Sequence, residues 1–221
     1  MKKKSIIILV SVIVVVALLL ALYFSKIIFA PSHNYSVSAN FEDGMAGGII
    51  TGEGTKNWEI VDDGSGNKVF RIDNSKSGDW PSIALGDNNF TDGIIEFRVK
   101  IDQLNENEFG SGLISMFFRV QQQGGGYVIG LHPESKRIDL NRAESSGWVP
   151  IDGANATLSV VRGTWYNIKV VVNGNTITGF INGTQVFSVL DDKYKEGNIT
   201  MSAGPYTIAE FDDIKIEKMN P

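Results

Sequence analysis

The chain has 221 residues, a formal net charge of −5 at pH 7 and no cysteine. Four of its 20 basic residues and none of its 25 acidic residues precede residue 31, so the rest of the chain is strongly acidic. This balance argues against nucleic acid or anionic lipid as a partner, because phosphate binding needs clustered Lys and Arg. The lack of cysteine excludes disulfides, thiol chemistry and thiolate metal sites.

The N-terminal residues combine a short basic stretch with a long apolar run. Lysines at positions 2–4 precede the uncharged run Ile6–Phe24, which only Ser11 interrupts. At a rise of ~1.5 Å per residue a helix over this run is about 28 Å long, close to the thickness of the hydrocarbon layer of a bilayer. The apolar region of a cleavable signal peptide is shorter, about 7–15 residues. The pattern therefore predicts an uncleaved, single-pass signal anchor in the cell membrane, with the lysines in the cytoplasm and the C-terminal bulk outside the cell.

The sequence after the anchor predicts a single extracellular domain on a short stalk. No Pro- or Ser-rich linker interrupts it, and its hydrophobic content suffices for a core. Two alternatives stay open for the N-terminus: cleavage after Ala30, and a pilin-type leader cut after the lysines, with the apolar helix packed in a filament. The expected divisions are a cytoplasmic tail at 1–5, the transmembrane anchor at 6–24, a stalk at 25–37 and the domain at 38–219.

The stretch 164–217 reads as short strands separated by turn signals. Asn173-Gly174 and Asn182-Gly183 each stand between β-branched and aromatic residues, and Asn-Gly supplies the two left-handed residues of a type I′ turn. These turns predict an antiparallel meander. Upstream, residues 93–101 alternate between apolar and charged side chains, which is typical of a strand with one buried and one solvated face.

Short strands with Gly, Asn and Asp turns between them fill the rest of the domain. This many strands imply two packed antiparallel sheets, an all-β sandwich or jelly roll with almost no helix outside the membrane segment. Strands are expected at 35–41, 57–61, 68–73, 93–101, 113–121, 127–132, 137–141, 157–161, 165–172, 176–181, 184–190, 198–203 and 209–217.

Five Asn-X-Ser/Thr sequons make the chain a candidate glycoprotein, if the host has the machinery. Chance in an Asn- and Thr-rich β protein is the other interpretation. The sequons begin at Asn34, Asn89, Asn155, Asn182 and Asn198.

Several segments together resemble a known family. Phe41-Glu-Asp-Gly44 and Trp58–Arg71 are similar to the opening of concanavalin A-like, or laminin G-like, jelly-roll domains, and Phe118–Gln121, Trp165–Val172 and Phe211–Ile216 are similar to later segments. The resemblance implies the fold of legume lectins, many carbohydrate-binding modules, laminarinase-type glycoside hydrolases and a keto-disaccharide hydrolase-like family. Fold alone does not choose among these functions.

The resemblance supplies a catalytic test. Laminarinase-type members carry their catalytic carboxylates as Glu-x-Asp-x-x-Glu on one strand, and retaining hydrolysis needs two carboxyl groups about 5–5.5 Å apart. The nearest match keeps Asp139 but has Arg137 and Arg142 where the two Glu should stand. A guanidinium acts neither as nucleophile nor as general acid. Carboxylate-pair hydrolysis is therefore disfavoured, and neither of the two histidines has a Ser or Cys partner in a recognisable triad.

A binding surface is the remaining interpretation, because aromatic rings stack on sugars and planar polar side chains bind their hydroxyls. Arg119 and Gln121 share a strand parity that would place both on one face. Trp148 falls in an expected loop, and the alternative for Tyr127 and Trp148 is packing under a hairpin. The ligand-binding residues that the resemblance implies are Arg119, Gln121, Tyr127, Asp139, Arg142 and Trp148. The other tryptophans are assigned to the core or its rim: Trp58, Trp80 and Trp165.

The resemblance also implies a structural calcium ion that would join the two ends of the domain. Calcium binds six to eight oxygen ligands, carbonyls included. The implied ligands are a carbonyl at Glu42, the carbonyl of Gly66 and the carboxylate of Asp212. The alternative is that the acidic residues here only form turns and solvated strand edges.

The sequence thus predicts a membrane-anchored, extracellular, lectin-like domain that binds a glycan or a cell-surface polysaccharide without catalysis. Two rivals stay open. One is a glycoside hydrolase or lyase of the same fold, and the other is a pilin-like or cell-envelope structural subunit.

Overall fold

The computed structural model describes residues 35–46, 49–50, 57–105 and 111–219. Strands make up most of these residues, which form one compact unit. The described residues contain no helix that is long and apolar enough to cross a membrane. The expected cytoplasmic tail, the signal anchor and most of the stalk lie outside the described residues.

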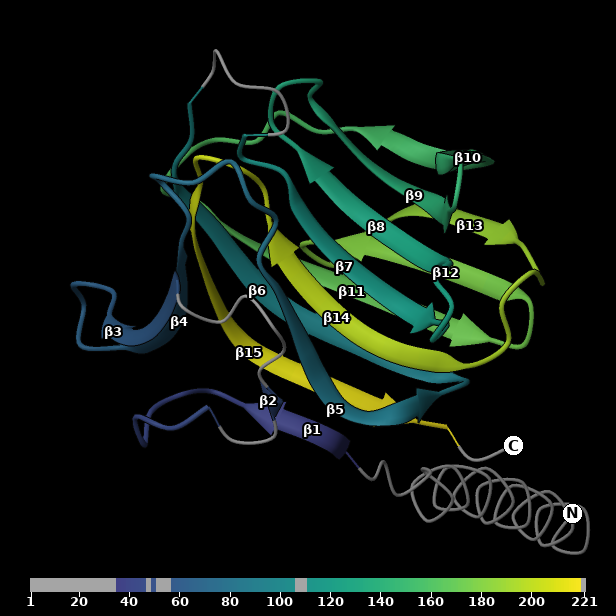
Figure 1. Ribbon diagram of the computed structural model, residues 1–221, viewed down its shortest axis with the longest axis horizontal. Helices are drawn as coiled ribbons and strands as arrows, with labels where there is room; N and C mark the ends of the chain where they lie inside the picture. Colours follow the sequence, from purple (N-terminus) through teal and green to yellow (C-terminus); the bar gives the residue numbers. More distant parts are fainter. Residues whose placement is uncertain (1–34, 47–48, 51–56, 106–110, 220–221) are drawn as a thin grey trace, which may run out of the picture. The chain divides into compact units, whose positions relative to one another are not determined.

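Two antiparallel sheets build the domain, as the sequence predicted, and the long central strands of both run along the same diagonal of the view in Figure 1. Sheet A contains, in spatial order, β13 (Thr184–Leu190), β12 (Thr176–Ile181), β11 (Trp165–Asn173), β6 (Gly93–Gln103), β15 (Ile208–Lys218), β4 (Lys68–Asp73) and β3 (Trp58–Asp62), and β1 (Tyr35–Ala39) also pairs with β15. Sheet B contains β10 (Gly147–Thr157), β9 (Arg137–Glu144), β8 (Gly126–His132), β7 (Ile114–Val120), β14 (Gly197–Ala203), β5 (Ser82–Phe90) and β2 (Ile49–Ile50).

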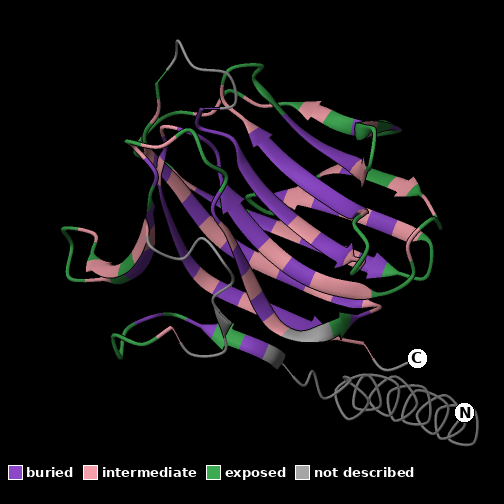
Figure 2. Cartoon of the chain, in the orientation of Figure 1, coloured by how far each residue is buried: buried purple, intermediate pink, exposed green. Residues whose placement is uncertain are grey.

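The hydrophobic core lies between the two sheets. On β6 the expected alternation is confirmed: Ile95, Phe97 and Val99 are buried in the core, while Glu96 and Arg98 are half-buried on the outer face. The same alternation appears in Figure 2 as purple and pink bands along the strands. Burying each large apolar side chain stabilises the fold by about 1.5–3 kcal/mol, which lets a chain without disulfides hold two sheets together.

Of the two turns predicted in the meander, one is confirmed and the other lies one residue further along the chain. Asn182 and Gly183 both have positive φ (48° and 78°) between paired Ile181 and Thr184, as a type I′ turn requires. In the preceding hairpin Asn173 still pairs with Thr176, so the two-residue loop is Gly174–Asn175, and only Gly174 has a positive φ. The expected type I′ turn at Asn173-Gly174 is therefore wrong by one residue.

Sheet B contains strands that were not predicted from the sequence. β10 covers the stretch expected to be a loop around Trp148 and ends at Thr157, so the strand expected at 157–161 is wrong. β10 is an edge strand, where Pro150 needs no partner for the amide hydrogen that it lacks. β5, with Gly, Asp and two Asn among its nine residues, has a poor strand propensity and was not predicted.

Candidate functional site

A groove of about 1070 Å³ lies on the outer face of sheet B, on the side away from the core. Strands β7, β8, β9 and β14 provide its floor, and β10 provides one wall. Its aromatic lining consists of Trp80, Phe117 and Trp148. Its polar lining includes Ser82, His132, Arg137, Thr200 and Ser202. This size and this mixture are typical of sites for small organic ligands.

Trp148 forms an exposed aromatic wall of the groove. β10 places it opposite Ala143 of β9, and its side chain keeps 38% of its surface exposed. Its ring makes edge contacts with Phe117, at 6.1 Å between ring centroids, and with His132, at 6.3 Å. The two contacts fix the orientation of the indole without covering it, so part of the ring stays available to a ligand.

A buried carboxylate holds the polar end of the groove. Asp139 is 6% exposed and accepts hydrogen bonds from His132 Nε2 at 2.8 Å, Arg137 Nε at 2.7 Å and Asn141 Nδ2 at 2.9 Å. Alternate residues of a strand share a face, so Arg137, Asp139 and Asn141 all point to the outer side of β9. Across the strand pair His132 lies opposite Arg137, and Gly130 lies opposite Asp139.

The proton arrangement of this cluster follows from the charge on Asp139. Burial acts to raise the pKa of Asp139, but the hydrogen bonds and positive charges of His132 and Arg137 outweigh it and hold the pKa below its ordinary value. Asp139 is therefore ionised at neutral pH and can only accept. His132 Nε2 must donate the bond between them, so a neutral imidazole carries its lone pair on Nδ1.

Gly130 makes room for the imidazole. A Cβ on Gly130 would lie 2.5 Å from His132 Nε2 and 3.1 Å from Asp139 Oδ1. Any other residue at this position would push the ring away from the carboxylate. The missing side chain in the middle of β8 is thus a condition for the contact between His132 and Asp139.

Strand β7, next to the groove, also contains a buried hydroxyl without a partner. Ser115 of β7 is 2% exposed and pairs across the sheet with Gly130 and with Ser202. Its Oγ has no hydrogen-bond partner among the protein atoms of the described residues. A buried hydroxyl is costly to leave unpaired, so this atom is a candidate to bind a buried water.

The structure places the residues predicted for ligand binding in two groups. Trp148 lines the groove and Asp139 lies beside it, beneath His132 and Arg137. The other four do not line it. Tyr127 is fully buried and donates its hydroxyl to Asp191, which also accepts from Arg142 at 3.3 Å.

The position of Arg119 explains why the predicted shared face of Arg119 and Gln121 is not found. A bulge sets Phe118 and Arg119 against the single residue Ile199, and Arg119 adopts a positive φ of 52°. Its side chain therefore turns into the protein and is 2% exposed. The shared face predicted for Arg119 and Gln121 does not follow, because a bulge breaks the two-residue period between them. Gln121 instead donates to the carbonyl oxygens of Arg119 and Glu196.

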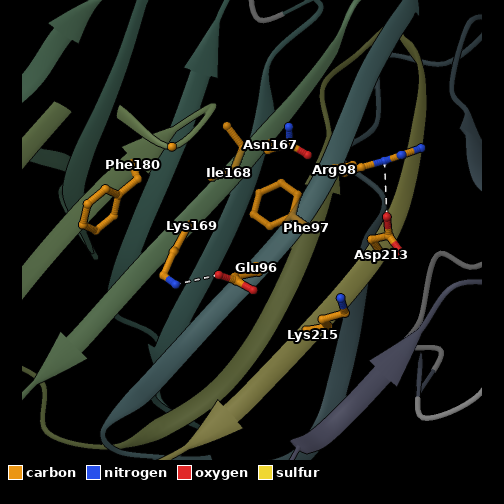
Figure 3. Close-up of a pocket in the computed structure, with 10 residues that line it drawn as sticks. Glu96, Phe97, Arg98, Asn167, Ile168, Lys169, Phe180, Asp213 and Lys215 are labelled. Carbon is orange, nitrogen blue, oxygen red and sulfur yellow. Dashed lines mark ion pairs between the residues drawn. The ribbon is translucent and has the colours of Figure 1, made fainter. Parts of the chain in front are cut away.

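A second, smaller hollow of about 550 Å³ lies on the outer face of sheet A (Figure 3). Four of the five charged side chains that line it are paired with one another, Lys215 being the fifth. Lys169 Nζ lies 2.7 Å from Glu96 Oε1, and Arg98 contacts Asp213 at 3.6 Å. Phe180 is its only half-exposed aromatic ring among the described residues. We therefore take the groove on sheet B, with its exposed ring and unpaired polar atoms, as the candidate site.

The implied calcium ligands come from neighbouring segments. The backbone N–H of Lys68 donates to Glu42 Oε1 at 3.2 Å, and the adjacent Asn67 donates to Asp212 Oδ2 at 3.2 Å. Cationic side chains contact two of these ligands, however. Lys68 Nζ donates to the Glu42 carbonyl at 3.2 Å, and Arg98 Nη2 lies 2.9 Å from Asp212 Oδ2. An ion here would have to displace one cation and share a carboxylate with the other, so calcium stays a prediction.

Calcium binding between Glu42, Gly66 and Asp212 would raise the melting temperature of the domain. For a dissociation constant of about 1 mM, typical of weak extracellular sites, ~10 mM CaCl₂ would stabilise the fold by about 1.4 kcal/mol, or roughly 3–6 °C. Differential scanning calorimetry in CaCl₂ and in MgCl₂ measures this. Asp212→Asn should abolish the rise and Lys68→Ala should enlarge it. Equal curves in the two salts would contradict the prediction.

The fold and the groove define the chain as a concanavalin A-like jelly-roll protein. It belongs to the 3-keto-alpha-glucoside-1,2-lyase-like domain family, whose model matches residues 46–217. No curated protein sequence matched the chain.

Several solved structures share this fold. The carbohydrate-binding module CBM66 from Bacillus subtilis has a TM-score of 0.61 at 18% identity and covers 77% of this chain and 96% of its own. A β-1,3-1,4-glucanase (lichenase) from a mouse hindgut metagenome has a TM-score of 0.56 at 15% identity, covering 82% and 98%. Domain 4 of an extracellular arabinanase from Geobacillus stearothermophilus, in complex with arabinotriose, has a TM-score of 0.56 at 16% identity, covering 84% and 93%. At these identities the likeness establishes the fold alone.

Proposed function

We propose that the chain binds a carbohydrate in the groove on sheet B. The observation that carries the proposal is the exposed indole of Trp148 beside polar side chains whose hydrogen-bonding capacity is not used up. The terminal guanidinium nitrogens of Arg137 have no protein partner among the described residues, and neither has the hydroxyl of Ser115. A sugar ring stacked on Trp148 would bring its hydroxyls toward the guanidinium of Arg137, which lines the same groove.

Related folds support a carbohydrate as the ligand. A carbohydrate-binding module and an arabinanase domain in complex with arabinotriose have the same architecture. The acidic balance of the chain favours a ligand of this kind over nucleic acid.

Removal of the Trp148 ring should abolish most of the affinity. We expect Trp148→Ala to weaken glycan binding at least tenfold, or about 1.4 kcal/mol, because the stacking surface is lost while the sheet remains intact. Retention of the full chain in detergent micelles on a glycan array identifies the ligand, and titration calorimetry measures the loss. Phe180→Ala, which removes a ring from the hollow on sheet A, is the matched control and should bind normally. Equal weakening by both variants, or by neither, would contradict this site.

Carboxylate-pair hydrolysis has little support in the groove. Among the described residues that line it, only Glu134 carries a carboxylate. Asp139 lies beneath the surface with its oxygens bonded to His132, Arg137 and Asn141. Retaining hydrolysis requires one ionised and one protonated carboxyl facing the same bond, and this arrangement offers no such pair.

We further propose that the signal anchor holds the domain outside the cell. The length of the apolar run at 6–24 and the lysines before it support this topology. Protease treatment of intact cells should remove the domain while the chain remains in the membrane fraction. The mass of the mature chain tests the rivals, because a start at Ser5 or Ile6 would indicate a pilin-type subunit instead.

A further inference from the structure

A hollow of about 440 Å³ adjoins the groove on sheet B at the turn between β8 and β9. Ser111, Pro133 and Glu134 line both the groove and the hollow, so the two spaces meet at these residues. The apolar part of the hollow consists of Leu104, Pro133 and Val160. A ligand longer than one sugar ring can therefore continue from the groove into the hollow.

Two exposed cations, Lys136 and Arg162, line this hollow. The chain has six arginines, and five of them pair with a carboxylate: Arg71, Arg98, Arg119, Arg137 and Arg142. Within the described residues Arg162 has no such partner, and Lys136 has none either. Both side chains keep their full capacity to bind an anion.

The charge of the hollow differs from that of the chain around it. After residue 30 the chain carries 16 basic residues (20 in total, less the four before residue 31) and 25 acidic residues. Among the described residues that line the hollow, two are cations and one, Glu134, is a carboxylate. Arg137, which follows Lys136 in the sequence, adds a third cation at the groove. An acidic chain thus concentrates positive charge where the groove and the hollow meet.

Backbone hydrogen bonds hold both cations in position. The carbonyl oxygen of Lys136 accepts from the N–H of Leu158 at 2.8 Å, which ties the β8–β9 turn to the end of β10. Next to Arg162, the N–H of Gly163 donates to the carbonyl oxygen of Ile101 at 2.9 Å. Because the two turns are fixed without a ligand, binding has less conformational entropy to remove.

The backbone at Lys136 is strained. Its φ is +50°, a conformation that glycine adopts more easily because it has no Cβ. A lysine therefore occupies a position where glycine would relieve the turn. Strained residues of this kind are concentrated at functional sites. The strain and the unpaired charge are independent observations, and both indicate a task for this side chain.

We propose that the hollow recognises a negatively charged group of the glycan, so that the ligand is an acidic oligosaccharide. This inference rests on the proposed carbohydrate groove. One sugar ring stacks on Trp148, and a later unit of the same chain places its anionic group in the hollow beside Lys136 and Arg162. A uronic acid carboxylate and an ester sulfate or phosphate share this chemistry, because each offers charged oxygen atoms to an ammonium and a guanidinium.

The test compares acidic glycans with neutral partners of the same backbone. The full chain, in micelles of an uncharged detergent without a sugar headgroup, is applied to an array of polygalacturonate and its methyl ester, dextran sulfate and dextran, and phosphorylated and unmodified dextran. We expect one acidic member to be retained at least tenfold more strongly than its neutral partner at ~20 mM salt. The preference should shrink at ~200 mM salt, because salt screens exposed charges. The pair that shows the preference identifies the anionic group.

Four variants locate the charge recognition. Lys136→Gly removes the cation together with its strained Cβ, so the domain should stay folded. This variant and Arg162→Gln should each weaken retention of the acidic glycan about three- to tenfold and leave the neutral partner within about twofold. Glu134→Gln should strengthen retention of the acidic glycan, because it removes a like charge. Lys215→Gln, on sheet A, lowers the net charge equally and is the matched control, which should bind as the wild type does.

The outcomes distinguish this inference from the binding proposal. A loss confined to acidic glycans in Lys136→Gly and Arg162→Gln supports both. Equal retention of acidic and neutral partners, abolished by Trp148→Ala, overturns the acidic ligand and leaves the carbohydrate groove standing. Equal weakening by Lys215→Gln would show attraction by net charge alone and also overturn the inference. Retention of no glycan at all would refute the proposed function itself.

Discussion

Arg119→Met should destabilise the domain by about 3–5 kcal/mol, the usual cost of removing one partner from a buried, bonded ion pair. The guanidinium donates to the carbonyl oxygens of Thr91, Tyr194 and Gly174 and to the carboxylate of Asp92, at 2.9–3.0 Å. Thr91 and Asp92 belong to the turn between β5 and β6, and Gly174 belongs to the hairpin between β11 and β12. One side chain of sheet B therefore ties the loops at one end of sheet A.

Chemical denaturation measures this loss as a free energy of unfolding. A typical domain has only about 5–15 kcal/mol of stability, so the variant would be barely folded. Arg119→Lys should also be costly, because an ammonium cannot bond four acceptors in the directions that a guanidinium fork reaches. Arg142→Met is the control, since Arg142 is half-exposed and its contacts with Asp191 and Glu144 are 3.3 Å long. If both methionine variants unfold at the same denaturant concentration, the role assigned to Arg119 is wrong.

The second large effect should appear at Glu210, a fully buried carboxylate on the outer side of sheet A. It pairs with Lys100 Nζ at 2.6 Å and with the guanidinium of Arg71. Burial acts to raise the pKa of Glu210, but the hydrogen bonds from Lys100 and Arg71 outweigh it and hold the pKa below its ordinary value. We expect Glu210→Gln to cost about 1–3 kcal/mol at pH 7, less than a fully enclosed pair, because both cations keep contact with solvent.

The sign of the pH dependence follows from the lowered pKa. A carboxyl group whose pKa is lowered by folding stabilises the fold at pH values above its pKa in the unfolded chain. This contribution is lost as the pH falls through the pKa of the folded state. Between pH 7 and about pH 3 the free energy of unfolding should therefore decrease more steeply for the wild type than for Glu210→Gln. Glu96→Gln breaks the half-exposed pair with Lys169 and should change stability by less than about 0.5 kcal/mol. Parallel curves for the wild type and Glu210→Gln would contradict this account.

Local sequence patterns predicted the elements whose environment is regular. The alternation along β6 and the Asn182-Gly183 turn each follow from a two-residue period or from backbone preferences, so they could be read without coordinates. β10 could not, because an edge position, invisible in the sequence, is what allows Pro150 within a strand. The prediction that Arg119 and Gln121 share one face was wrong for a similar reason, because a single bulge reverses the face of every residue that follows it.

The candidate site was predicted only in part, since its contacts cross strands. Asp139 was predicted as a ligand-binding residue, but its contact with His132 was not, because a catalytic triad would pair a histidine with Ser or Cys. A turn at 133–136 brings His132 opposite Arg137 and Gly130 opposite Asp139. The spacing Gly-x-His before this turn and Arg-x-Asp after it does indicate the contact. Such an interpretation requires the exact position of the turn, which the sequence does not give.

The four indole N–H resonances offer the most direct test of the groove on sheet B as the binding site. Each can be assigned by replacing one of the four tryptophans, and they report on separate places: Trp80 and Trp148 line the groove, Trp58 packs against the core, and Trp165 lies beneath Arg98 on sheet A. Titration with the glycan identified on the array should shift the signals of Trp148 and Trp80 and leave those of Trp58 and Trp165 in place. A shift confined to Trp165 would place the ligand on the opposite sheet and contradict the account.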